Sequence, residues 1–198
     1  MNFKDLQILP EHFFLQDTIK IARQLLGKYL IKVQNNGKVL GGMIVESEAY
    51  EQDDPASHSY RGQTPRNEPM FRKGGISYVY FIYGMYHCFN VVTGLDGVGS
   101  AILIRSLEPL FGEDIMKKNR KTDNIKKLTS GPGMLCQALD ITRKDNCVNL
   151  QNGHIGIYHD RTDNVKINIV QVPRIGIKEE NKKLYRFYIK GNEYVSVK

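Results

Sequence analysis

SYVYFIYGMYHCFN, residues 77–90, is the stretch that decides how this chain is organised. Residues 78–82 are aromatic or β-branched, Gly84 supplies a backbone suited to a tight turn, and residues 87–93 resume a strand pattern. The stretch therefore predicts a β-hairpin with Tyr83 at its tip. A large ring at a hairpin tip cannot be buried in its own sheet, so Tyr83 either packs on a neighbouring loop or faces a partner.

The sequence on either side of this hairpin predicts a mixture of strands and short helices. Asp17 is a candidate N-cap for an apolar-periodic segment that stops at Gly27, and Asn35-Asn36-Gly37 is a hairpin turn signal. Helices are predicted over residues 17–26, 110–119 and 134–141, and strands over residues 28–34, 38–47, 78–82, 87–93, 100–107, 153–158, 165–172, 184–189 and 193–197.

Residues 51–73 lack apolar periodicity and read as a long loop, which is uncommon inside a compact domain unless the loop has a function. No linker or repeat divides the chain. We therefore predict one α+β domain over residues 1–198, with a mostly antiparallel sheet, a few short helices and a protruding β-hairpin.

Composition limits the classes of function. The chain has 198 residues, enough for one core, and carries a net charge of +7, which permits binding to polyanions. The densest basic run, residues 117–127, is typical of a solvated helix end and loop. No signal peptide or membrane span is evident, so we expect a cytoplasmic protein, associated with the nucleoid if the source is bacterial.

The cysteines and histidines form no metal-binding pattern. Cys88, Cys136 and Cys147 are widely spaced without a CxxC pair, and the histidines show no HExxH. The sequence thus predicts three reduced thiols and requires neither a metal nor another cofactor.

Several motifs together resemble one known family. VESEAY (residues 45–50), His58, QTPRN (63–67), the hairpin and AILIRSLEPL (101–110) are similar to the alkyladenine (3-methyladenine) DNA glycosylase family, and the resemblance extends from about residue 19 to the end. It implies a monomer that removes alkylated or deaminated purines from double-stranded DNA: 3-methyladenine, 7-methylguanine, hypoxanthine and ethenoadenine. The hairpin would then contact DNA.

Such an enzyme must flip the base out of the helix, fill the gap, hold the base and deliver water. A ring inserted into the stack recovers about 1–3 kcal/mol, which suits Tyr83, and Met85 and Tyr86 would then lie along the minor groove. Tyr50 and Tyr80 offer flat faces, and His58 offers a ring and a hydrogen-bonding edge. The resemblance implies that these three sandwich the base and that Asn90 rejects the amino group of guanine.

The water needs a carboxylate near the sugar. Glu46 and Glu48 lie two apart on a predicted strand and share a face, so periodicity does not choose between them. The resemblance implies Glu48 as general base, with Arg105 holding the water and the carboxylate, and leaves Glu46 a structural role. No lysine nucleophile is matched, so we predict a monofunctional enzyme that leaves an abasic site.

Contacts to the DNA backbone are the least specific part of the resemblance. It implies such contacts for Thr64, Arg143 and the Gly176 amide, with Arg61 and Arg66 as nearby candidates. The chain departs from the family pattern at three places: a loop over residues 58–64 about one residue shorter, Met134 where a lysine is expected, and His87 where an apolar residue is expected.

Two other functions fit parts of the sequence. Basic charge and exposed aromatic residues also suit a non-catalytic single-strand binding module. Glu46 and Glu48 could form the carboxylate pair of a hydrolase of free nucleosides or glycosides, although parallel side chains on one strand are poorly placed to flank a sugar.

Overall fold

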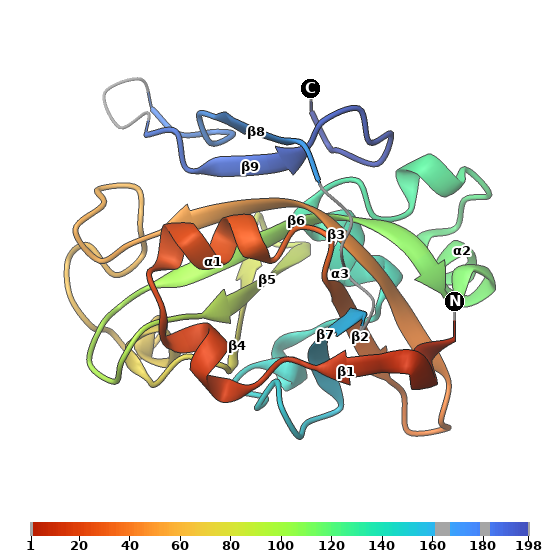
Figure 1. Ribbon diagram of the computed structural model, residues 1–198, viewed down its shortest axis with the longest axis horizontal. Helices are drawn as coiled ribbons and strands as arrows, with labels where there is room; N and C mark the ends of the chain where they lie inside the picture. Colours follow the sequence, from red (N-terminus) through yellow and green to blue (C-terminus); the bar gives the residue numbers. More distant parts are fainter. Residues whose placement is uncertain (1, 161–166, 179–182, 198) are drawn as a thin grey trace.

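The computed structural model describes residues 2–160, 167–178 and 183–197, and its elements are arranged around one antiparallel sheet (Figure 1). The strands are β1 (Leu6–Ile8), β2 (Tyr29–Val33), β3 (Val39–Tyr50), β4 (Ser77–Ile82), β5 (Tyr86–Val92), β6 (Ala101–Phe111), β7 (Ile155–Asp160), β8 (Ile169–Val172) and β9 (Arg186–Ile189). The helices are α1 (Thr18–Gln24), α2 (Glu113–Arg120) and α3 (Pro132–Ala138), with short 3₁₀ turns at Phe3–Asp5, Glu11–Leu15, Glu68–Phe71, Ile125–Lys127 and Arg143–Asp145. The predicted α+β class with a mostly antiparallel sheet is confirmed.

Strand β3 is the centre of the sheet. The strand order is β1-β7-β2-β3-β6-β5-β4, and β9 also pairs with β3 and carries β8. Along one edge of β3, the N-terminal half pairs with β2 and the C-terminal half with β9, so the sheet forks there (Figure 1). Gly42 permits the close approach of β6, because a Cβ at this position would collide with the Glu108 carbonyl oxygen. The fork brings the end of β3, with its acidic residues, against β9.

The apolar core is formed by both helices and strands. Asp17 caps α1 by accepting a hydrogen bond of 2.7 Å from the Lys20 amide, as predicted. Ile21 of α1, Phe89 of β5 and Ile104 of β6 are fully buried in one cluster. Because alternate residues of a strand point to opposite faces, this core leaves Asn90 and Arg105 directed to the other face.

The β4–β5 hairpin forms as the sequence predicts. Tyr83 and Gly84 both have positive φ angles, 53° and 69°, and Ile82 pairs with Tyr86 across the turn. Two successive residues with positive φ are the signature of a type I′ turn, whose twist matches that of the strands. The ring of Tyr83 is 85% exposed at the tip.

Three predicted elements differ in the structure. The helix predicted from residue 110 is wrong at its start, because β6 continues through Pro109 to Phe111, and α2 begins only after Gly112 at φ 75°. Pro109 pairs with Gly42 of β3 on one edge of β6 and lies beyond residues 101–103, where β5 pairs with the other edge, so its ring interrupts no ladder with β5.

The strand predicted over residues 193–197 is also wrong. Its backbone is bound by side chains instead: the Ser196 amide donates to Glu46, and the Val197 carbonyl accepts from Arg186. Of the strand predicted over residues 165–172, residues 165–166 lie outside the described part, and β8 begins at Ile169. The short strand β1 carries no recognisable sequence signal. No helix in the described ranges is long and apolar enough to span a membrane.

Candidate active site

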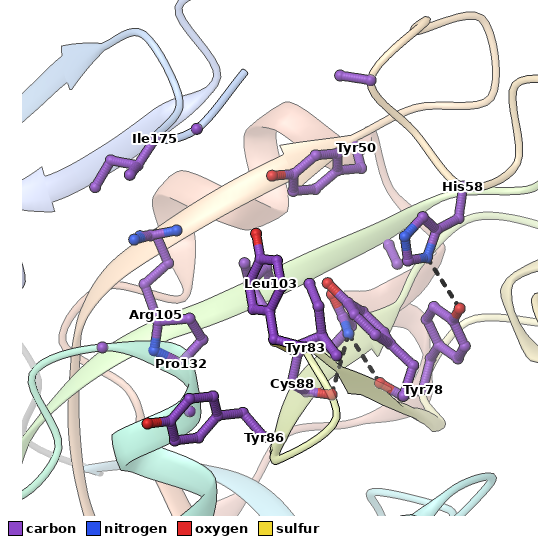
Figure 2. Close-up of a pocket in the computed structure, with 18 of the residues that line it drawn as sticks. Tyr50, His58, Tyr78, Tyr83, Tyr86, Cys88, Leu103, Arg105, Pro132 and Ile175 are labelled. Atoms are coloured by element: carbon purple, nitrogen blue, oxygen red, sulfur yellow. Dashed lines mark hydrogen bonds between the residues drawn. The ribbon is translucent and has the colours of Figure 1, made fainter. Parts of the chain in front are cut away.

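A cavity of about 620 Å³ opens between the β4–β5 hairpin, β3, β6 and the segments around residues 131–134 and 175–177 (Figure 2). Eight of the residues predicted to act on DNA or the base line it: Tyr50, His58, Tyr80, Tyr83, Tyr86, Asn90, Arg105 and Gly176. In Figure 2 the rings of Tyr50 and His58 lie along the top of this cavity and Tyr86 lies at its bottom. The fold therefore brings together side chains from distant parts of the sequence.

Glu48 lies directly behind the cavity wall. The residue is fully buried, and its carboxylate accepts three hydrogen bonds: from the Tyr50 hydroxyl at 2.9 Å, from Arg105 Nη1 at 3.1 Å and from the Ile175 amide at 2.8 Å. All three donor residues line the cavity, whereas Glu48 does not. A solvent molecule would thus reach Glu48 only where one of these donors gives way.

Arg105 connects the two acids of β3. Its Nε lies 3.2 Å from Glu46 Oε1 and its Nη1 lies 3.1 Å from Glu48 Oε2, so both carboxylates share one face of the strand, as the alternation predicts. Burial acts to lower the pKa of Arg105, but the charges of Glu48 and Glu46 outweigh it and raise the pKa above its usual value. The guanidinium is a fixed positive charge at the cavity wall.

The ring of Tyr50 is held from behind by Arg174. The Arg174 guanidinium lies 4.6 Å from the ring centroid, is almost fully buried and forms an ion pair with Asp54 at 2.5 Å. Because Arg174 does not line the cavity, it covers the ring face turned away from it. Burial, and next the Glu48 charge, raise the pKa of Tyr50 well above its usual value, so its hydroxyl remains a donor.

His58, Tyr78 and Tyr80 form a second aromatic wall. His58 Nδ1 is 3.0 Å from the Tyr78 hydroxyl, and the His58 and Tyr80 ring centroids are 4.7 Å apart at 67°. Desolvation of the ring, and then the charge of Arg66, lower the pKa of His58, although the residue is exposed at the cavity mouth. Burial raises the pKa of Tyr78 to about 12. Neutral rings therefore face the cavity from this side.

Asn90 lines the cavity from β5. Its Nδ2 donates to the Tyr78 carbonyl at 2.9 Å, which fixes the amide plane, and the residue is only 4% exposed. A rigid polar group at this place can exclude a substituent of a bound base by its shape alone.

The remaining predicted contact residues lie outside the cavity. Met85 is 64% exposed at the hairpin tip, and Thr64 is exposed and bonded to Asn67. Arg143 is exposed and lines a separate hollow, of about 760 Å³, together with His87. The structure thus places these three residues around the cavity mouth or beyond it rather than inside.

Two departures from the family pattern fall on different sides of the hairpin. Met134 lines the cavity and is 38% exposed. His87 points to the opposite side, where its ring lies 5.0 Å from Phe81. Arg61 and Arg66, the two nearby phosphate candidates, are both exposed, and the Arg66 guanidinium lies 5.6 Å from the centroid of the Tyr80 ring.

Several functional neighbours escaped the sequence reasoning. Tyr78, Asp54, Arg174 and Ile175 all support predicted site residues, and Ile175 reaches Glu48 across 127 positions of sequence. Only the neighbourhood of Gly176, a predicted contact, could have pointed to Arg174 and Ile175.

Comparison with known proteins gives a consistent result. Residues 12–193 match the model of the Methylpurine-DNA glycosylase (MPG) family. A protein of Francisella tularensis subsp. tularensis is 50% identical, covering 91% of this chain and 94% of its own length. One from Carboxydothermus hydrogenoformans is 48% identical (96% and 100%), and one from Methanoculleus marisnigri is 46% identical (95% and 98%). All three are provisionally named 3-methyladenine DNA glycosylase. The chain belongs to the methylpurine-DNA glycosylase family, which makes it a hydrolase of DNA repair.

Proposed function

We propose that this chain removes alkylated or deaminated purines from duplex DNA by flipping the base into the cavity of about 620 Å³ and attacking the sugar with water activated by Glu48. One observation carries the proposal: a buried carboxylate, held by Arg105 and the Ile175 amide, lies immediately behind a cavity walled by Tyr50, His58 and Tyr80. Glu48 would take the proton of the water and offset the positive charge that grows on the sugar.

The walls suit a purine. Tyr50 and Tyr80 present rings that can stack on the base, and cationic 3-methyladenine and 7-methylguanine would gain cation–π attraction. Neutral hypoxanthine and ethenoadenine would bind through edge contacts to His58 and Asn90. Asn90 would exclude guanine, because its amide, held by the bond to the Tyr78 carbonyl, would clash with the extra amino group.

The reaction would be monofunctional. A covalent intermediate with the sugar would need a nucleophile such as a lysine amine. None of the residues described as lining the cavity is a lysine, so water would attack the sugar directly. Tyr83 would fill the gap left by the flipped base, and Met85 and Tyr86 would follow the minor groove. Phosphates would be held by Thr64, Arg143 and the Gly176 amide, with the protein acting as a monomer.

The test is a panel of duplexes, each with one lesion, assayed for abasic-site formation with wild type and Glu48→Gln. Removing a general base lowers the rate by about 10²–10⁴-fold, so the variant should bind lesion DNA yet barely excise. An excision rate unchanged by Glu48→Gln would refute the role of Glu48. A borohydride-trapped adduct would contradict direct attack by water.

The same panel separates the two rivals. A pure binding module would form no abasic sites with either protein. A hydrolase of free nucleosides would release base from nucleosides but not from duplexes. A carboxylate pair is already disfavoured, because all three donors to Glu48 line the cavity, whereas two of the donors to Glu46, Arg186 and Ser196, do not.

A further inference from the structure

Four buried charged side chains form a line that ends at Glu48. Arg186 Nε lies 2.7 Å from Glu46, whose Oε1 also accepts from Arg105 Nε at 3.2 Å, and Arg105 Nη1 lies 3.1 Å from Glu48. The four side chains come from β9, β3 and β6 and are each less than 10% exposed. Removing one member of such a line leaves another buried charge without its partner.

The far end of this line, Arg186 and Glu46, is hydrogen-bonded to residues 194–197, a segment that neither lines the cavity nor bonds to Glu48. The backbone amide of Ser196 donates to Glu46 Oε2 at 2.8 Å, and Arg186 donates to the carbonyl of Val197. The segment itself is anchored, since Val195 is 7% exposed and Ser106 donates to the Tyr194 carbonyl. Both oxygens of Glu46 are therefore occupied by fixed donors.

This anchoring decides the direction in which Arg105 points. A guanidinium is planar, so fixing its Nε against Glu46 also fixes where Nη1 can reach. If Glu46 shifted, Arg105 would follow it or turn wholly toward Glu48, and the Arg105–Glu48 contact would change in either case. Neither Arg186 nor Ser196 lines the cavity, so they can act on the reaction only through Glu46 and Arg105.

We propose that Arg186 and the Ser196 amide are positioning groups that hold Glu46, and through it Arg105, in the orientation that Glu48 needs for the chemical step. This inference rests on the proposed role of Glu48. It predicts loss of rate without loss of binding, because a misplacement of about 1 Å far from the reacting atoms can cost about 100-fold in rate.

The critical variant is Ser196→Pro, which deletes the amide N–H that binds Glu46. Two matched variants accompany it. Ser196→Ala removes only a buried hydroxyl that has no hydrogen-bond partner in the described part of the chain. Val195→Ala loosens the packing of the same segment without touching the bond to Glu46.

Single-turnover excision, equilibrium binding to a lesion duplex and thermal unfolding are measured for wild type and all three. We expect Ser196→Pro to excise about 10-fold to 100-fold more slowly, with binding within about twofold of wild type, and both matched variants to keep the wild-type rate. Equal rate losses in Ser196→Pro and Val195→Ala would overturn the inference, because the segment would then act only through stability.

Arg186→Met gives an independent reading if Ser196→Pro does not fold. It keeps the Ser196 amide but removes the second cation from Glu46 and the donor to the Val197 carbonyl. The same loss of rate with retained binding is expected. A wild-type rate in a folded Arg186→Met protein would overturn the inference. If wild type itself excises no lesion, the proposed function fails instead, so the two failures are distinguishable.

Discussion

The hydroxyl of Tyr50 lies 2.9 Å from Oε2 of Glu48, so one residue is both a wall of the cavity and a cap on the buried acid. Burial and the Glu48 charge raise the pKa of Tyr50 well above its usual value, which keeps the hydroxyl protonated at neutral pH. For water to reach this oxygen, either the Tyr50 hydroxyl or Arg105 must move aside. The ring and the hydroxyl thus have separable roles.

Tyr50→Phe removes the cap and keeps the ring. We expect lesion binding and single-turnover excision within about threefold of wild type, because a lost hydrogen bond is worth little when water can replace it. Tyr50→Leu also loses the stacking surface, worth about 1–3 kcal/mol, and should bind at least about fivefold more weakly. A fall of about 100-fold in the Tyr50→Phe rate would instead show that the hydroxyl takes part in the chemistry.

Tyr83→Asn tests whether the Tyr83 ring inserts into the DNA stack, and it should not disturb the hairpin. Asn followed by Gly is the favoured pair for a type I′ turn, so unfolding stability should be unchanged or slightly higher. Loss of one stacking ring should weaken binding to a lesion duplex by about 5-fold to 150-fold.

The control is Leu95→Asn, which removes another side chain that is 63% exposed but lies away from the cavity. Binding is followed by fluorescence anisotropy. Equal affinities for wild type and Tyr83→Asn would rule out insertion of the ring.

The sequence was sufficient where local chemistry sets the structure. The turn at Tyr83 and Gly84 and the shared face of Glu46 and Glu48 follow from residue type and strand period alone. What it could not supply are contacts between distant segments. Ile175 meets Glu48 only because β3 and β9 pair, and the closure of Glu48 behind its three donors has no sequence signature.

Tertiary contacts also explain the two wrong elements. Pro109 favours a helix start locally, but pairing with Gly42 of β3 keeps it in a strand. Residues 193–197 have the composition of a strand. Their backbone groups are hydrogen-bonded to the buried side chains of Glu46 and Arg186 instead of to a neighbouring strand. Leaving the buried charges of Glu46 and Arg186 without these hydrogen bonds would cost more free energy than this short segment gains by pairing as a strand.

Breaking the buried ion pair between Arg174 and Asp54 should lower the stability of the protein strongly. Both side chains are fully buried, so Arg174→Met leaves the Asp54 carboxylate uncompensated and should cost about 3–5 kcal/mol of unfolding free energy. Urea denaturation measures the loss. Adding Asp54→Asn should restore part of it, and a double variant no more stable than Arg174→Met would argue against the ion pair as the cause.

Binding to DNA should depend steeply on salt. Engaging about five phosphates predicts that log affinity falls with log salt at a slope of about −4 to −5. Arg143→Gln should reduce the magnitude of this slope by about one if the exposed guanidinium meets a phosphate. Lys20→Gln, an exposed cation on α1 away from the cavity, should leave it unchanged. A slope near zero for wild type would contradict binding to the backbone.

His58 should remain neutral to lower pH than an ordinary histidine. Desolvation and then the positive charge of Arg66 lower its pKa, and the neutral ring is the form that does not repel a cationic base. Because the unfolded chain then binds the proton more readily, protonation of His58 favours the unfolded state. Folding stability therefore decreases as pH falls from the usual histidine pKa to the lowered pKa of His58. Above the usual histidine pKa, His58 has no effect on stability.

Arg66→Gln removes one of the two causes and should raise the pKa of His58 toward its usual value. NMR titration of the His58 ring protons gives the pKa directly, with Arg72→Gln as the control, since that exposed cation of the same loop is paired with Glu68. Excision of cationic 7-methylguanine by Arg66→Gln should fall off at a higher pH than for wild type, while excision of neutral hypoxanthine should shift less. If the His58 titration curves of Arg66→Gln and Arg72→Gln both coincide with the wild-type curve, Arg66 does not set the charge of His58.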